Sequence, residues 1–263
     1  MIEKKEQENA NVEQEKELQL AIKAAKAAGD YLKSRKGIHV DSMEGRDIKL
    51  SSDKNSEKII MDILSESGIS VLSEEYGLKK EEGEACWIVD PLDGTINYYK
   101  GIDELACVSI ALWKEESPVV GVINRFAKDE LFYGSMDKGA YLNEKPIHTS
   151  GMTETGQAVM ATGFPVKRAY DTKSLTDFVK QIQYFKKVRM LGAAAIMGTF
   201  VACGRLDAYF EDEIMLWDVA AATAIVNAAG GSTMLKILQD NKVICKCFAT
   251  KELMEDYYAK IEN

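Results

Sequence analysis

The sequence predicts a layered fold of helices and β-sheets, α+β in its first half and α/β in its second. Two stretches near the start carry apolar residues at helical spacing. Residues 104–143 then resemble short strands in quick succession, as in an antiparallel meander. From residue 158 onward, strand-like and helix-like stretches alternate, which is typical of a layered α/β arrangement.

Two helices are expected at the start of the first half. Apolar residues recur at helical spacing from Leu18 to Leu32 and predict a long helix over residues 14–35. A second helix is predicted to begin at Ser51 or Ser52, since either side chain is a good N-cap. These helices precede the strands of the first half.

The remaining elements follow from short apolar runs and their boundaries. Strands are expected at 69–75 and 86–90, before the meander. In the second half, the order is strand 158–164, helices 175–187 and 192–204, strand 207–211, helix 216–231, short strands, and a closing helix over 250–261. We therefore divide the 263 residues into a charged N-terminal extension (1–13), an α+β half (14–148) and an α/β half (149–263).

Residues 1–13 are charged and lack the apolar core of a secretory signal, so they are expected to form a solvated helix end or a disordered tail. No apolar run reaches the roughly 18 residues of a membrane span. The five cysteines are an odd number without a C-x-x-C pair, which indicates reduced thiols in a cytoplasmic protein. Cys245 and Cys247 alternate around Lys246 and are expected to pack in the core.

Charge and histidine content restrict the chemistry. A formal net charge of −9 disfavours a nucleic acid as the main partner, because such binders usually carry a basic surface. It leaves a phosphorylated small molecule open, since a metal can supply positive charge locally. The only two histidines, His39 and His148, favour neither a zinc hydrolase nor a Ser-His-Asp triad. Hydrolytic chemistry here would depend on carboxylates and a hard cation.

The stretch from Trp87 to Gly101, "WIVDPLDGTINYYKG", is the most informative in the chain. An apolar strand runs directly into Asp90 and Asp93, with a proline between them and a glycine after them. Asp, Pro and Gly are ordinary turn formers, so a plain loop is one interpretation. Two carboxylates held close together repel unless a cation lies between them, so the other is a metal site at the end of a strand.

Other acidic residues could converge on the same place. Glu74 ends the strand before, and Asp53 and Asp218 lie in the first turns of helices. A carboxylate in a first helical turn is favoured by the helix dipole in any case, which is the structural alternative for both. Together these are the oxygen ligands that Mg²⁺ prefers, with Mn²⁺ as a substitute, and two such ions can clamp the oxygens of a phosphate displacement.

Two ordered signatures resemble those of the inositol monophosphatase family. "DPLDGTIN" is similar to its first signature, and "LWDVAAATAIVNAAGG" to its second. "SEE", "SSDKNSEKI", "GAYLNEKPIHTS", "TGFP" and "GAAA" fall where that family has similar segments. The resemblance covers roughly residues 15 to 260.

The resemblance implies an α-β-α-β-α sandwich, a homodimer, and Mg²⁺-dependent, Li⁺-sensitive hydrolysis of small phosphate monoesters with two or three ions. The implied metal ligands are Glu74, Asp90, Leu92 (through its carbonyl), Asp93 and Asp218. The implied catalytic residues are Asp53, Glu74 and Thr95, with Thr95 aiming the attacking water. The implied substrate contacts are Gly94, Thr95, Gly192, Ala193, Ala194, Glu211 and Asp218.

The substrate is expected to be inositol 1-phosphate. The stretch Ile96-Asn97-Tyr98 replaces the Lys-Glu-Phe usual in adenosine bisphosphate phosphatases, which favours an inositol or sugar phosphate. Ala228 replaces a usual glutamate, the stretch after Gly231 looks shortened, and "KLSS" precedes Asp53 in place of a commoner Val-Thr form, so substrate choice stays open. The alternatives are fructose 1,6-bisphosphate, a nucleotide bisphosphate, histidinol phosphate, or a non-catalytic phosphate sensor.

Overall fold

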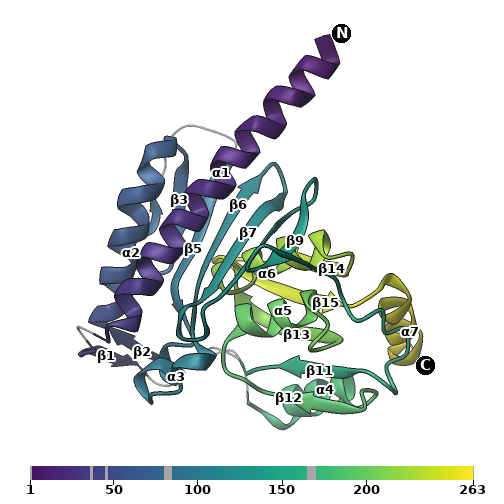
Figure 1. The fold of residues 1–263 in the computed structure, drawn as a ribbon. Helices are drawn as coiled ribbons and strands as arrows, with labels where there is room; N and C mark the ends of the chain where they lie inside the picture. Colours follow the sequence, from purple (N-terminus) through teal and green to yellow (C-terminus); the bar gives the residue numbers. More distant parts are fainter. Residues whose placement is uncertain (1, 36–37, 45–46, 80–84, 165–169, 263) are drawn as a thin grey trace.

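A computed structural model describes residues 2–35, 38–44, 47–79, 85–164 and 170–262 of the chain. Two large β-sheets alternate with three layers of helices (Figure 1). This α-β-α-β-α arrangement confirms the predicted sandwich.

The larger sheet has eight strands in the order β10-β9-β8-β7-β6-β5-β3-β4. Neighbouring strands are antiparallel except for β3 and β5, which run parallel. The run from β6 to β9 is the predicted meander. Strands β5 and β10 continue the antiparallel pairing at its two ends. The strands are β3 Ser70–Ser73, β4 Gly77–Lys79, β5 Ala85–Asp93, β6 Cys107–Lys114, β7 Ser117–Arg125, β8 Glu130–Ser135, β9 Gly139–Leu142 and β10 Lys145–Ile147.

Helices α1 (Ile2–Lys33) and α2 (Ser51–Leu64) cover one face of this sheet, and the hairpin of β1 (Val40–Glu44) and β2 (Asp47–Leu50) joins them. The helix predicted over 14–35 begins earlier, and its first turns project beyond the sheet (Figure 1). The predicted serine cap of α2 is wrong. Leu50 is the N-cap, and its amide donates a hydrogen bond to the Asp53 carboxylate at 2.7 Å.

The opposite face packs on a central layer made of α5 (Ala194–Ala202) and α6 (Leu216–Ala228). Small residues allow close approach, because a side chain at Gly198 would overlap Ala222 of α6. The alternation of a half-buried strand is visible in β5, where Trp87 packs toward α1 and α2 and Ile88 toward the central layer.

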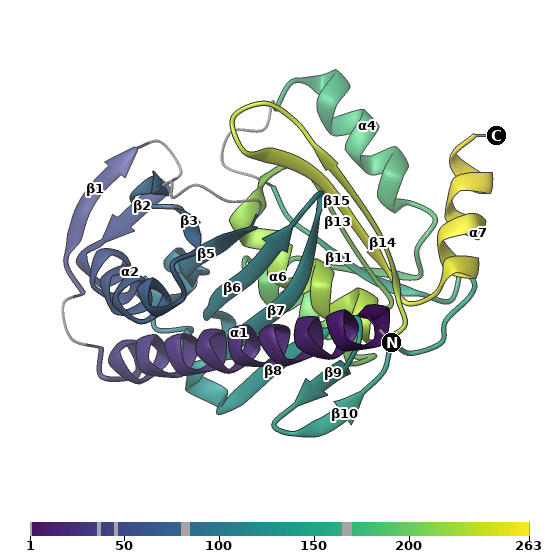
Figure 2. The same cartoon turned by 90° about the horizontal axis from the view of Figure 1, so that it is seen from above.

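A five-stranded sheet in the order β12-β11-β13-β15-β14 covers the other side of this layer. Helices α4 (Thr172–Ile182) and α7 (Lys251–Ile261) lie on its outer face (Figure 2). Cys245 and Cys247 are buried side by side in this core, as predicted. The strands are β11 Val159–Thr162, β12 Lys187–Arg189, β13 Ala208–Met215, β14 Ser232–Ile237 and β15 Lys242–Phe248.

The short elements between these layers position the candidate site. Helix α3 (Thr95–Tyr99) and the 3₁₀ turn η2 (Asp103–Leu105) link β5 to β6. Two other 3₁₀ turns, η1 (Ser65–Ser67) and η3 (Phe126–Lys128), follow α2 and β7. Across the described ranges, no helix is both long and apolar enough to cross a membrane. The division of the chain at residue 148 stays a prediction.

Candidate active site

The parallel pairing of β3 and β5 brings Glu74 next to Asp90. Ser73 is paired with Val89, and the Glu74 amide continues the ladder by donating to the Val89 carbonyl at 3.3 Å. Parallel strands end at the same edge of a sheet, so the residues after each strand lie side by side. The expectation that these two acidic strand ends share an edge is confirmed.

Asp90 is a buried carboxylate surrounded by like charges. Its side chain is 2% exposed, and its Oδ1 accepts a hydrogen bond from the Leu92 amide at 2.9 Å. Burial raises its pKa well above the usual range, and the charges of Glu74, Asp93 and Asp218 raise it further. The C-terminal part of β5 therefore carries a carboxyl group whose charged form is disfavoured by burial and by the charges around it.

Asp93 faces the N-terminus of α5. Its Oδ1 and Oδ2 accept hydrogen bonds from the amides of Ala194 and Ala195 at 3.3 and 2.8 Å. Burial raises its pKa to about 6, although these amides act in the opposite direction. The buried thiol of Cys107 also donates to Oδ2 at 3.7 Å, a contact that sequence patterns did not predict. Asp93 thus links the first signature to the predicted substrate pocket.

Asp218 comes to the same place from the central layer. It lies in the first turn of α6, which the Ser109 hydroxyl fixes against β6 by donating to the Trp217 carbonyl at 3.3 Å. Burial raises the pKa of Asp218 well above its usual range, and Asp93 and then Glu74 add to the effect. Carboxylates from three separate segments, the residue after β3, the end of β5 and the start of α6, therefore lie within electrostatic reach of Asp90, as the metal-site interpretation requires.

The donor set of this acidic cluster, Glu74, Asp90, Asp93 and Asp218, fits a hard cation, since every donor is oxygen. As they stand, no three His, Cys, Asp or Glu side chains of the described residues are placed to hold a metal ion. In this arrangement Asp90 and Asp93 accept hydrogen bonds from backbone amides. A bound cation would offset the repulsion among these carboxylates.

Gly94 and Thr95 form a tight turn beside the cluster. Gly94 has φ = 83°, and a Cβ there would lie 2.5 Å from the Leu105 carbonyl and 3.2 Å from the Cβ of Ala193. Only glycine fits such a position. The Thr95 hydroxyl donates to the Leu92 carbonyl at 2.9 Å, so its oxygen has a defined place at the start of α3.

Asp53 lies in the neighbouring helix α2. It is 4% exposed and accepts the Leu50 amide, as described above. One turn further on, the Ser56 hydroxyl donates to the Pro91 carbonyl at 2.8 Å and joins α2 to the turn of the first signature. Asp53 therefore lies on a helix that is hydrogen-bonded to the turn of the first signature. Its bond to the Leu50 amide caps α2, which fits the alternative that this carboxylate stabilises the start of its helix.

The residues predicted to contact the substrate lie at the start of α5 and on β13. Gly192 has φ = 72° and precedes Ala193, the N-cap of α5. Glu211 is 5% exposed on β13, and its carboxylate lies where a side chain at Gly163 would be. Glu211 also raises the pKa of Asp218, so pocket and cluster are within electrostatic reach.

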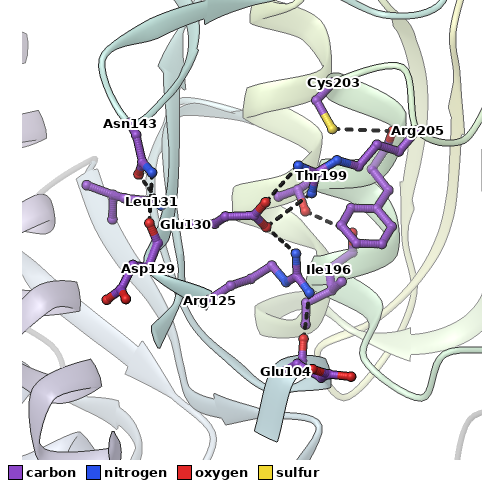
Figure 3. Close-up of polar contacts among 11 residues, drawn as sticks. Glu104, Arg125, Asp129, Glu130, Leu131, Asn143, Ile196, Thr199, Cys203 and Arg205 are labelled. Carbon is purple, nitrogen blue, oxygen red and sulfur yellow. Dashed lines mark hydrogen bonds and ion pairs between the residues drawn. The ribbon is translucent and has the colours of Figure 1, made fainter. Parts of the chain in front are cut away.

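A network of ion pairs and hydrogen bonds around Arg125 and Glu130 contacts η2 (Figure 3). Arg125 pairs with Glu130 and donates to the Glu104 carbonyl at 2.6 Å, while Arg205 holds Glu130 at 2.7 Å. Both guanidinium groups lie near the ring of Phe200 in α5, 4.9 and 5.2 Å from its centroid. Arg125 thereby connects η2 and α5, the two segments that flank the turn at Gly94.

Comparison with known proteins agrees with this geometry. The model of the inositol monophosphatase family matches residues 13–261. The chain belongs to the inositol monophosphatase family. Its membership makes it a phosphatase of the phosphoric monoester hydrolase class and implies a small phosphorylated substrate.

Individual relatives of this inositol monophosphatase family member cover most of its length. It is 37% identical to inositol monophosphatase 3 of Solanum lycopersicum over 235 residues, 85% of this chain and 87% of the relative. It is 35% identical to the Nus factor SuhB of Xylella fastidiosa over 219 residues, 81% and 79% of the two chains. The solved inositol monophosphatase of Anabaena (Nostoc) superposes with a TM-score of 0.79 at 31% identity and covers 94% of this chain and 95% of that one.

Proposed function

We propose that the protein hydrolyses inositol 1-phosphate to inositol and phosphate in a Mg²⁺-dependent reaction at the acidic cluster. The observation that carries the proposal is the convergence of Glu74, Asp90, Asp93 and Asp218. The charges of its neighbours raise the pKa of Asp90, and Asp93 and Glu74 raise that of Asp218. Such a set is unfavourable by itself and is stabilised by divalent cations.

In this proposal the carboxylates of the acidic cluster and the Leu92 carbonyl hold Mg²⁺. Bound there, Mg²⁺ would offset the charge of the phosphate oxygens and lower the pKa of a coordinated water. Gly94 and Thr95 bind the phosphate through their amides, since backbone N–H groups at a helix start favour an anion. Thr95 aims the attacking water with its hydroxyl, which the Leu92 carbonyl holds in place. Asp53 and Glu74 assist in orienting that water.

The polyol part of the substrate is proposed to contact Gly192, Ala193, Ala194 and Glu211. The Glu211 carboxylate, 5% exposed on β13, is suited to accept hydrogen bonds from sugar-type hydroxyls. Thr95 contacts no polyol group in this scheme. Substitutions of Thr95 therefore test the hydrolytic step, and substitutions of Glu211 test recognition of the polyol.

A phosphate-release panel tests the proposal. Purified protein with Mg²⁺ is given inositol 1-phosphate, fructose 1,6-bisphosphate, adenosine 3′,5′-bisphosphate, histidinol phosphate and p-nitrophenyl phosphate. We expect the highest kcat/KM on inositol 1-phosphate, and inhibition by Li⁺. A clear preference for another ester would refute this substrate while keeping the phosphatase, and sedimentation of the same sample would test the predicted homodimer.

A further inference from the structure

Asn97 lies at the junction of three backbone segments around the candidate site. Its Nδ2 donates to the carbonyls of Leu105 and Leu191 at 2.9 Å each and of Gly192 at 3.2 Å. The main-chain carbonyl of Asn97 also accepts a hydrogen bond from the Ile102 amide at 2.8 Å. One side chain of α3 thereby holds η2 and the segment that precedes α5.

We propose that Asn97 is a positioning residue that sets the distance between the phosphate-binding turn and the polyol-binding segment at Gly192–Ala194. This role rests on the proposed function, because it assigns the two segments to two parts of one substrate. Asn97 contacts neither part itself and acts through the backbone that it holds.

The glycines around Asn97 support a built junction. A Cβ at Gly192 would lie 3.3 Å from the Asn97 Nδ2, and one at Gly94 would lie 2.5 Å from the Leu105 carbonyl. Both glycines have positive φ, 72° and 83°. The turn at Gly94, the η2 turn and the segment at Gly192 therefore lie close together around the side-chain amide of Asn97. A side chain on either glycine would push these segments apart.

Asp93 and Asn97 hold the same segment in different ways. Asp93 accepts hydrogen bonds from the amides of Ala194 and Ala195. Asn97 instead donates to the carbonyls of Leu191 and Gly192, earlier in the same segment. The Asp93 carboxylate is also a proposed cation ligand, so its oxygens serve two purposes. The uncharged amide of Asn97 has no such second role, and its hold on the segment is independent of the cation.

The test is the substitution Asn97→Asp, which turns the donating nitrogen into an oxygen that faces three carbonyl oxygens. The matched control is Asn124→Asp, since the Asn124 Nδ2 donates at 2.8 Å to the Ala25 carbonyl and joins β7 to α1 away from the site. Two quantities are measured in both variants: amide hydrogen exchange, and kcat/KM on inositol 1-phosphate and on p-nitrophenyl phosphate.

We expect Asn97→Asp to speed amide exchange in residues 102–106 and 191–195. Its kcat/KM on inositol 1-phosphate should fall about ten- to hundredfold, because small misplacements of a substrate are this costly. The aryl ester has no polyol to place, so its kcat/KM should fall less than about threefold. In Asn124→Asp the ratio of the two kcat/KM values should equal that of the wild type.

If amide exchange in both segments is unchanged in Asn97→Asp, Asn97 does not hold them together and the proposal is overturned. Faster exchange with equal losses on the two esters would overturn its role in placing the substrate. If Asn97→Asp does not fold, Asn97→Ala removes the donor without adding a charge and decides by the same measurements. If the wild type hydrolyses no phosphate ester, the proposed function fails, while hydrogen exchange still decides whether Asn97 joins the segments.

Discussion

Replacing Asp93 by Asn should change how the stability of the cation-free protein depends on pH. Burial holds the pKa of Asp93 at about 6, against an unperturbed value of 3.8. The difference is about 2 pH units, and each unit corresponds to 1.36 kcal/mol. The charged carboxylate therefore costs the folded protein about 3 kcal/mol at neutral pH relative to its protonated form.

The direction of the effect follows from proton binding. Between about pH 4 and pH 6 the folded protein retains a proton at Asp93 that the unfolded chain has lost, so stability falls as the pH rises through this window. Asn does not titrate and is free of this loss. It forfeits part of the hydrogen bonding to the Ala194 and Ala195 amides. The preference of these amides for the charged carboxylate is already contained in the pKa of about 6.

The assay is urea unfolding in EDTA at pH 4.5 and pH 7.5. The difference in free energy of unfolding, Asp93→Asn minus wild type, should be more positive by about 2 kcal/mol at pH 7.5 than at pH 4.5. The variant therefore gains stability relative to the wild type at the higher pH. The exposed Asp137, in the turn after β8, supplies the control Asp137→Asn, which should follow the wild type at both pH values. A difference that is equal at the two pH values, or larger at pH 4.5, would show that Asp93 carries no burial penalty.

Three further substitutions test separate parts of the site. Glu211→Ala should lower kcat/KM on inositol 1-phosphate by about ten- to hundredfold, the value of a hydrogen bond to a charged group, and leave p-nitrophenyl phosphate nearly unaffected; equal losses would contradict a role in recognition. Gly94→Ala should destabilise the fold and lower kcat far more than Gly101→Ala, because both positions have positive φ but only the first would press a Cβ against the Leu105 carbonyl; similar effects in the two variants would refute the close-contact argument. Thr95→Ala should reduce kcat by more than about tenfold and keep the Mg²⁺ affinity measured by calorimetry, whereas a parallel loss of Mg²⁺ affinity would assign Thr95 to the metal site instead.

Local patterns predicted the elements that carry the site. The apolar run into Asp90 and Asp93 was interpreted as a strand that ends in a cluster of acids, and β5 with Asp90 and Asp93 at its end confirms this. The neighbouring strand that brings Glu74 to the same edge was also expected, because two short strands close in sequence commonly pair. Alternation alone placed Cys245 and Cys247 in the core.

Other features depend on contacts between distant segments and left no local pattern. The amides of Ala194 and Ala195 reach Asp93 only because α5 packs in the central layer. In the sequence, the stretch Ile96-Asn97-Tyr98 bears on substrate class, but nothing in it predicts the distant backbone segments that Asn97 holds. A polar amide three positions after a glycine turn is the available signal. The short strands β1, β2, β4, β10 and β12 were not predicted, since three to five residues carry too little periodicity. The N-cap of α2 was wrong because Asp53, inside the helix, binds the Leu50 amide in place of a serine cap.

The most direct test of the proposed chemistry is phosphate release from inositol 1-phosphate as a function of free Mg²⁺, for the wild type and Asp90→Asn side by side. The pKa of Asp90 is raised by all three other acids of the cluster, so its substitution tests whether the cluster as a whole binds the cation. We predict a saturable dependence on Mg²⁺ in the wild type, loss of activity in EDTA that added Mg²⁺ restores, and a fall of more than about a hundredfold in Asp90→Asn, since even indirect changes at metal sites cost 10–100-fold. Phosphate release that survives exhaustive chelation, or an Asp90→Asn protein with the turnover and Mg²⁺ dependence of the wild type, would contradict a metal-dependent site at this cluster.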